Sequence, residues 1–150
     1  MAHAHMMWLF AVDGAGFGVQ VGGGLSRAVM PNLSVGAELG AVIGLINGES
    51  DCYYGRQCFY YQGSLVPFAE LHASRSWVFD PWLRAGLGPA LVLHSDMDSL
   101  PPQLALIGSA AAGFDVRISH VVVGGFGTAN LVTGRQPLSA GFGVRLGAQW

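Results

Sequence analysis

The last part of the chain, residues 138–150, alternates between apolar residues and small or polar ones, and this alternation limits the possible folds most strongly. Every second position from Leu138 to Trp150 is apolar, and the positions between them hold Ser, Gly, Arg or Gln. A repeat of two residues is the period of a β-strand with one apolar face. The segment is also longer than the roughly 9–11 residues with which a tilted strand crosses a bilayer. The pattern therefore predicts a membrane-spanning strand.

The same alternation recurs along the rest of the chain. It covers residues 17–26, 33–45, 59–74, 82–94 and 104–119, while residues 121–132 are apolar on both faces. Together with residues 138–150, these segments make seven strands, and a barrel with an even number needs an eighth. Residues 2–12 are the candidate, because Asp13 and Gly14, a common hairpin pair, follow them directly in the sequence. Long polar connections at 47–58 and 95–103 alternate with compact ones, as in transmembrane barrels. We predict one all-β domain over residues 1–150, an eight-stranded antiparallel up-and-down transmembrane β-barrel.

The composition favours a barrel whose apolar face points outward. Hydrophobic residues make up 51% of the chain and charged residues 11%, whereas an average soluble protein has about 25% charged residues. No stretch of the sequence is long and apolar enough to predict a spanning helix. The net charge of −2 argues against a nucleic-acid partner, which requires a basic surface. A soluble ligand-binding β-barrel, with its apolar face inward, is the alternative.

The more polar faces of the predicted strands carry equal numbers of acidic and basic residues, which would lie in the lumen. They are Glu38, Glu70, Arg84, Asp115, Arg117 and Arg145. Because an isolated buried charge is very costly, we expect each arginine to contact one of these three acids. Tryptophans, Trp82 among them, are expected at the membrane-facing rims.

No residue pattern predicts catalysis, a metal site or a cofactor. Glu70, His72 and Ser74 share one strand face, but this spacing does not by itself bring a nucleophile, a base and an orienting acid together. Cys52 and Cys58 lie in one polar segment, and their spacing predicts a disulfide that stiffens a loop in an oxidising compartment.

The first seven residues lack the basic and apolar regions of a secretory signal. We therefore interpret residues 1–7 as a vector-derived start that replaces the native signal peptide. His3 and His5 are interpreted as remnants of a tag.

The chain resembles the small bacterial outer-membrane β-barrels typified by the OmpA transmembrane domain and OmpX. The resemblance is carried by the final strand and its aromatic end, that is by Phe142, Val144, Leu146, Ala148 and Trp150. In that class the last residues are the signal read by the outer-membrane assembly machinery. The resemblance implies a monomer in the outer membrane of a Gram-negative envelope, in contact with the lipid bilayer and lipopolysaccharide. A non-enzymatic structural or surface-interaction role is expected, with a narrow, porin-like pore for ions or small solutes and a lipid A-modifying hydrolase as alternatives.

Overall fold

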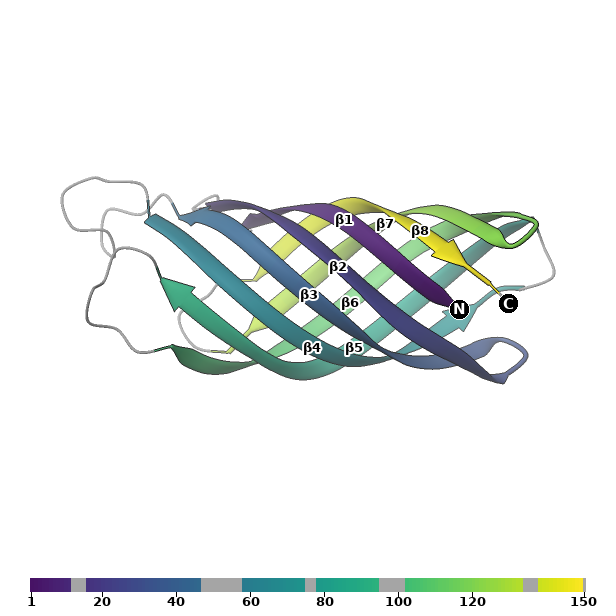
Figure 1. Cartoon of the computed structure of the whole chain (residues 1–150), viewed down its shortest axis with the longest axis horizontal. Coiled ribbons are helices and arrows are strands. Elements are labelled where there is room, and N and C mark those ends of the chain that lie inside the picture. The colour runs from purple at the N-terminus through teal and green to yellow at the C-terminus, as the bar shows by residue number, and fades with distance from the viewer. Residues whose placement is uncertain (12–15, 47–57, 75–77, 95–101, 134–137, 150) are drawn as a thin grey trace.

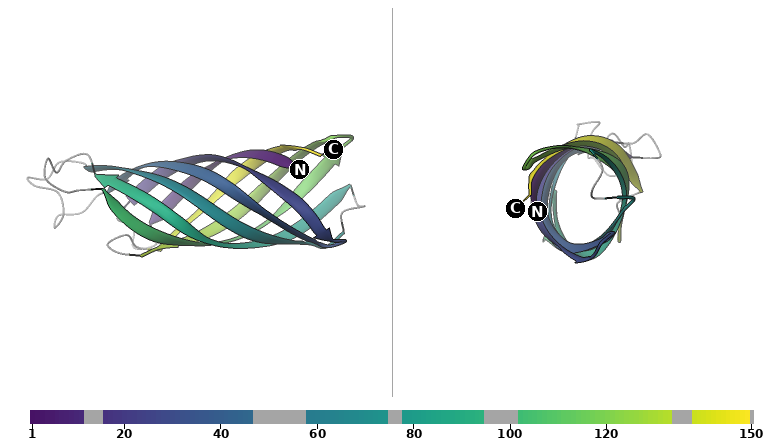
Figure 2. Two further views of the ribbon diagram at one scale, coloured as in Figure 1. Left: turned by 60° about the horizontal axis from the view of Figure 1, so that its bottom comes forward. Right: turned by 90° about the vertical axis from the view of Figure 1, so that its right-hand side faces the viewer.

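Eight antiparallel strands form a closed barrel (Figure 1). The computed structural model describes residues 1–11, 16–46, 58–74, 78–94, 102–133 and 138–149. The strands are β1 (Ala2–Ala11), β2 (Gly16–Met30), β3 (Leu33–Ile46), β4 (Cys58–His72), β5 (Phe79–His94), β6 (Gln103–Ile118), β7 (Val121–Val132) and β8 (Ser139–Ala148). Each strand pairs with the next along the chain, and β8 pairs with β1, so that no sheet edge is left open. The view along the axis shows this closed ring (Figure 2). The predicted eight-stranded antiparallel barrel is confirmed.

Both chain termini lie at one end of the barrel, here called the proximal end (Figure 1). Two-residue turns at 31–32 and 119–120 lie at this end, and Ser119 adopts a left-handed backbone conformation with φ of 56°. The opposite, distal end is where β1, β3, β5 and β7 finish. The two long connections predicted from the sequence, which join β3 to β4 and β5 to β6, both lie at the distal end.

The outer surface of the barrel is apolar. Large hydrophobic side chains are exposed on all eight strands and form a band around the barrel. Leu39, Leu87 and Phe142, for example, are 65%, 64% and 58% exposed. Among the described strand residues, Arg27 is the one Asp, Glu, Lys or Arg side chain that is exposed on this surface, and it lies close to a proximal turn. This face suits contact with lipid tails, and it overturns the alternative of a soluble barrel with an inward apolar face. The described residues include no helix with the length and hydropathy to span a membrane.

Three prolines, Pro67, Pro81 and Pro89, lie within strands, although a closed barrel has no free edge where a missing N–H is harmless. Pro67 in β4 pairs with β3, and Pro89 in β5 pairs with β6. The ladder between β4 and β5 is interrupted at both prolines, between the Ser64–Ala90 pair and the Phe68–Gly86 pair. Pro67 and Pro89 thus lie in the same interrupted stretch, while Pro81 lies at the start of β5, beyond the last residue pair of the β4–β5 ladder.

The charged side chains of the interior gather in its proximal part, while the distal part holds apolar side chains together with uncharged polar ones such as buried Gln20, Gln62 and Asn130. The charged part contains buried Glu38, Glu70, Asp80, Asp115 and Arg145. The apolar side chains form two packed clusters, the first of Met7, Leu9, Val42, Trp82, Ala111 and Phe126 and the second of Val66, Ala90, Val92, Ile107 and Val132. A buried polar network is thus present, but the prediction of a polar lumen was incomplete, because two packed apolar clusters also lie inside. Trp82, expected at a rim, is only 3% exposed and lies inside the barrel, so that expectation was wrong.

Candidate functional site

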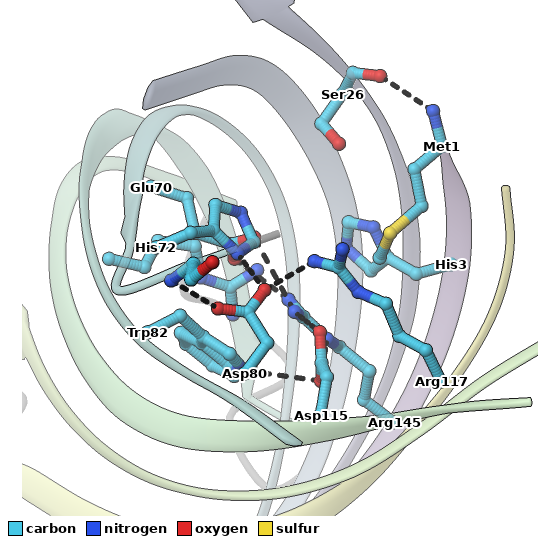
Figure 3. Close-up of polar contacts among 12 residues, drawn as sticks. Met1, His3, Ser26, Glu70, His72, Asp80, Trp82, Asp115, Arg117 and Arg145 are labelled. Carbon is cyan, nitrogen blue, oxygen red and sulfur yellow. Dashed lines mark hydrogen bonds and ion pairs between the residues drawn. The ribbon is translucent and has the colours of Figure 1, made fainter. Parts of the chain in front are cut away.

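Arg145 is the centre of the charged network (Figure 3). It projects inward from β8 and is 2% exposed. Its Nη1 donates a hydrogen bond of 2.7 Å to Glu70 Oε2, and its Nε donates one of 3.0 Å to Asp115 Oδ1. In a ring of eight strands, β8 lies opposite β4, so the bond to Glu70 crosses the interior. The network therefore ties opposite walls of the barrel together.

Trp82 holds this centre from the β5 side. Its indole Nε1 donates a hydrogen bond of 3.1 Å to Asp115 Oδ1. The guanidinium carbon of Arg145 lies 4.2 Å from the centroid of the Trp82 ring, which is a cation–π distance. Phe126 packs against the same ring with a centroid separation of 6.0 Å. The aromatic rings thus join the charged network to the first apolar cluster.

Asp80 forms a second centre nearer the proximal end. It is fully buried and accepts hydrogen bonds from Arg117, from His72 Nδ1 at 2.7 Å and from the Ser74 backbone N–H at 3.4 Å (Figure 3). Arg117 pairs with Asp80, an acid that the prediction of the lumen charges did not include.

Asp80 was missed because the predicted strand began at residue 82, whereas β5 begins at Phe79. The signal was present in the sequence. The inward period of two that includes Arg84 and Trp82 continues backward to Asp80.

His72 lies between two carboxylates. Its Nε2 is 3.0 Å from Glu70 Oε1, and its Nδ1 is 2.7 Å from Asp80 Oδ2. A general base toward Ser74 would need a ring nitrogen directed at the hydroxyl, but both nitrogens of His72 face acids. The shared face of Glu70, His72 and Ser74 is therefore arranged as an ion-pair network.

A third group surrounds Glu38 on β3. Arg84 Nη1 donates a hydrogen bond of 2.6 Å to Glu38 Oε2, and its guanidinium lies 5.1 Å from the centroid of the Phe68 ring. The Nε2 of His3 and the Nδ1 of His5 lie 3.3 Å and 3.6 Å from the same Glu38 oxygen. His3 and His5, which the sequence led us to interpret as tag remnants, are buried members of β1. Of the six predicted lumen charges, the structure pairs Arg84 with Glu38 and Arg145 with Glu70 and Asp115, while Arg117 takes a different acid.

The residues of the predicted assembly signal lie on the outer face of β8. Phe142, Val144 and Leu146 are 58%, 53% and 58% exposed, and Ala148 ends the strand. Trp150 and Cys52 lie outside the described residues, and only the backbone of Cys58 is described, as the start of β4. The disulfide and the recognition of this strand by assembly machinery therefore stay predictions.

Solved structures show which proteins share this fold. No protein-family model matches the sequence, and a search of curated proteins finds no match. The structure is similar to Neisserial surface protein A (TM-score 0.66, 14% identity), with 99% of this chain and 94% of that one covered. It is also similar to the N-terminal β-barrel domain of Pseudomonas aeruginosa OprF (TM-score 0.57, 15% identity, 97% and 95% covered). A third similar structure is the outer membrane enzyme PagL (TM-score 0.59, 12% identity, 99% of both chains covered). The chain thus has the fold of bacterial outer-membrane barrels.

Proposed function

We propose that this chain is a closed outer-membrane β-barrel with a structural and surface-interaction role. The apolar outer face and the shared fold support a place in the outer membrane of a Gram-negative envelope, with the lipid bilayer and lipopolysaccharide as its surroundings. In this orientation the proximal end faces the periplasm, because outer-membrane barrels have short periplasmic turns and longer external connections. The distal connections are then what the barrel presents outside the cell.

The main support for a barrel that is closed to ions is the hydrogen bond from Arg145 on β8 to Glu70 on β4. It crosses the interior of the barrel, and Asp115 and Trp82 fill the space beside it. Two apolar clusters pack inside the same barrel. An ion would have to displace buried, paired charges, and this step is costly.

Conductance in a planar lipid bilayer tests the closed state. The refolded barrel is expected to show no current steps above those of the lipid alone, at salt concentrations where porins conduct. The folded state of the protein added to the bilayer must be verified independently by heat-modifiable gel mobility. Reproducible single-channel steps from inserted protein would overturn the closed barrel in favour of the narrow pore.

Our proposal also includes a non-enzymatic role. It rests on the geometry at His72, where both ring nitrogens face carboxylates. The fold does not decide this point, because the similar structures include one described as an enzyme. Incubation of the folded barrel with lipopolysaccharide is expected to release no fatty acid, and release that depends on His72 would replace the structural role with lipid hydrolysis.

A further inference from the structure

His3, His5 and Glu38 come together on the interior wall although β2 separates β1 from β3. His3 pairs in register with Gly24, and Gly24 pairs in register with Glu38, so His3, Gly24 and Glu38 form one row across the sheet. His5 pairs with Gly22 in the same way. A Cβ atom at Gly22 would lie 2.6 Å from His5 Cε1, and one at Gly24 would lie 3.1 Å from His3 Cε1. The glycines of β2 therefore leave the space in which both imidazole rings reach toward Glu38.

The three side chains have the spacing of metal ligands. One ligand atom from each lies within 4.8 Å of the others, and all three residues are buried. The two measured separations from Glu38 Oε2 are 3.3 Å to His3 and 3.6 Å to His5. Around a tetrahedral Zn²⁺ with bonds of about 2.0–2.1 Å, neighbouring ligand atoms are roughly 3.3 Å apart. Small side-chain movements would therefore bring all three atoms into coordination distance.

The histidines also have nitrogen atoms that the described protein does not satisfy. His3 Nδ1 and both ring nitrogens of His5 are buried and have no hydrogen-bond partner among the described residues. His5 as a residue is only 6% exposed. Buried polar groups in native proteins nearly always have a partner. The unpartnered Nδ1 of His5 lies 3.6 Å from Glu38 Oε2, beside the Nε2 of His3, and this arrangement points to a ligand that accepts electron pairs.

The surroundings suit a cation. The described interior holds four buried carboxylates, Glu38, Glu70, Asp80 and Asp115, against three arginines, Arg84, Arg117 and Arg145. His72 lies between Glu70 and Asp80, so positive charge does not outnumber negative charge there. Arg84 binds Glu38 from the side and would act as the outer partner that orients a ligating carboxylate.

We propose that His3, His5 and Glu38 form a binding site for a divalent transition metal, Zn²⁺ by preference, on the proximal interior wall. Two imidazoles and one carboxylate are a common protein ligand set for zinc, and they leave a fourth position for water. The sequence predicted no metal site because a His-x-His pair on a strand and a glutamate on another strand do not form a recognisable motif. The metal would tie β1 to β3 across β2 and so hold the N-terminal strand in the barrel.

Metal binding by the full-length barrel, refolded in detergent and stripped with EDTA, tests the site. After loading with Zn²⁺ and desalting, elemental analysis is expected to find one zinc per chain, and the unfolding midpoint is expected to rise with zinc concentration. Titration with Co²⁺ should give the visible absorption of a four-coordinate site.

The informative variant is His5→Leu, because His5 has no hydrogen bond to lose in the metal-free state. It is expected to fold normally in EDTA and to weaken zinc binding by at least the roughly 10–100-fold that loss of an outer-shell partner alone costs. Glu38→Gln should weaken binding similarly. His120→Ala removes an exposed histidine in the proximal turn and should retain one zinc per chain. Absence of bound zinc in the parent barrel, or equal zinc in His5→Leu, would overturn the site.

Discussion

The guanidinium of Arg145 lies over the indole of Trp82, and both side chains contact the carboxylate of Asp115. The three residues come from β8, β5 and β6 and form a closed set inside the barrel. The ring positions the cation, and the cation neutralises the carboxylate, so that neither charge is buried alone. A cation–π contact of this desolvated kind contributes about 2 kcal/mol.

Removal of the central cation should strongly destabilise the barrel. Arg145→Leu leaves Glu70 and Asp115 without their arginine partner, and breaking a buried ion pair in this way costs about 3–5 kcal/mol. Urea unfolding in lipid vesicles would measure the loss. Arg27→Leu is the matched control, since Arg27 is exposed on the outer surface, and its effect should stay within about 0.5 kcal/mol. Similar free energies for the two variants would contradict the central role of Arg145.

Asp80→Asn should also destabilise the barrel, because Asp80 is fully buried and accepts hydrogen bonds from Arg117 and His72. The neutral amide cannot neutralise the buried guanidinium, so a loss of roughly 3 kcal/mol is expected. The free energy of unfolding again provides the measurement. An unchanged value would mean that Arg117 finds an equivalent partner without Asp80.

The outward facing of the apolar side chains predicts a cost that depends on depth in the bilayer. Leu87 lies near the middle of β5, and Leu87→Arg should reduce folding into vesicles by about 2–4 kcal/mol. Leu104 is 82% exposed near the distal start of β6, and Leu104→Arg should cost only about 0–1 kcal/mol. Equal costs at both positions would show that the lipid-facing band is misplaced.

Glycine has a steric role at some positions of the wall and none at others. A Cβ at Gly88 would overlap the backbone carbonyl of Leu65 on β4, so Gly88→Ala must push the strands apart, at about 1–3 kcal/mol. A Cβ at Gly63 would meet nothing within 4 Å, and Gly63→Ala should change stability by no more than about 0.5 kcal/mol. Thermal unfolding of the two variants in one detergent compares them directly, and a larger loss for Gly63→Ala would refute the steric assignment.

The strands and their outer faces could be predicted from the sequence because side chains on a strand alternate between two sides. Leu87 and Phe142 point outward as their phase requires. The predicted strand 82–94 begins three residues after the start of β5, and this error concealed Asp80, because the residues left out of the strand were assigned to a turn. The origin of residues 1–7 was inferred from their unusual composition, and this inference hid the role of His3 and His5 in β1.

The sequence by itself determined that the chain forms alternating strands, which side chains face lipid, and that the interior must contain balanced charges. These properties depend on the local period of two and on the cost of burying an unpaired charge. Only the tertiary structure decided which charges meet. Arg145 and Glu70 are 75 residues apart and approach each other because ring closure places β8 opposite β4. His3, Gly24 and Glu38 align because the register of three strands places them in one row. The period of a strand assigns each side chain to a face, whereas closure and register assign its partners.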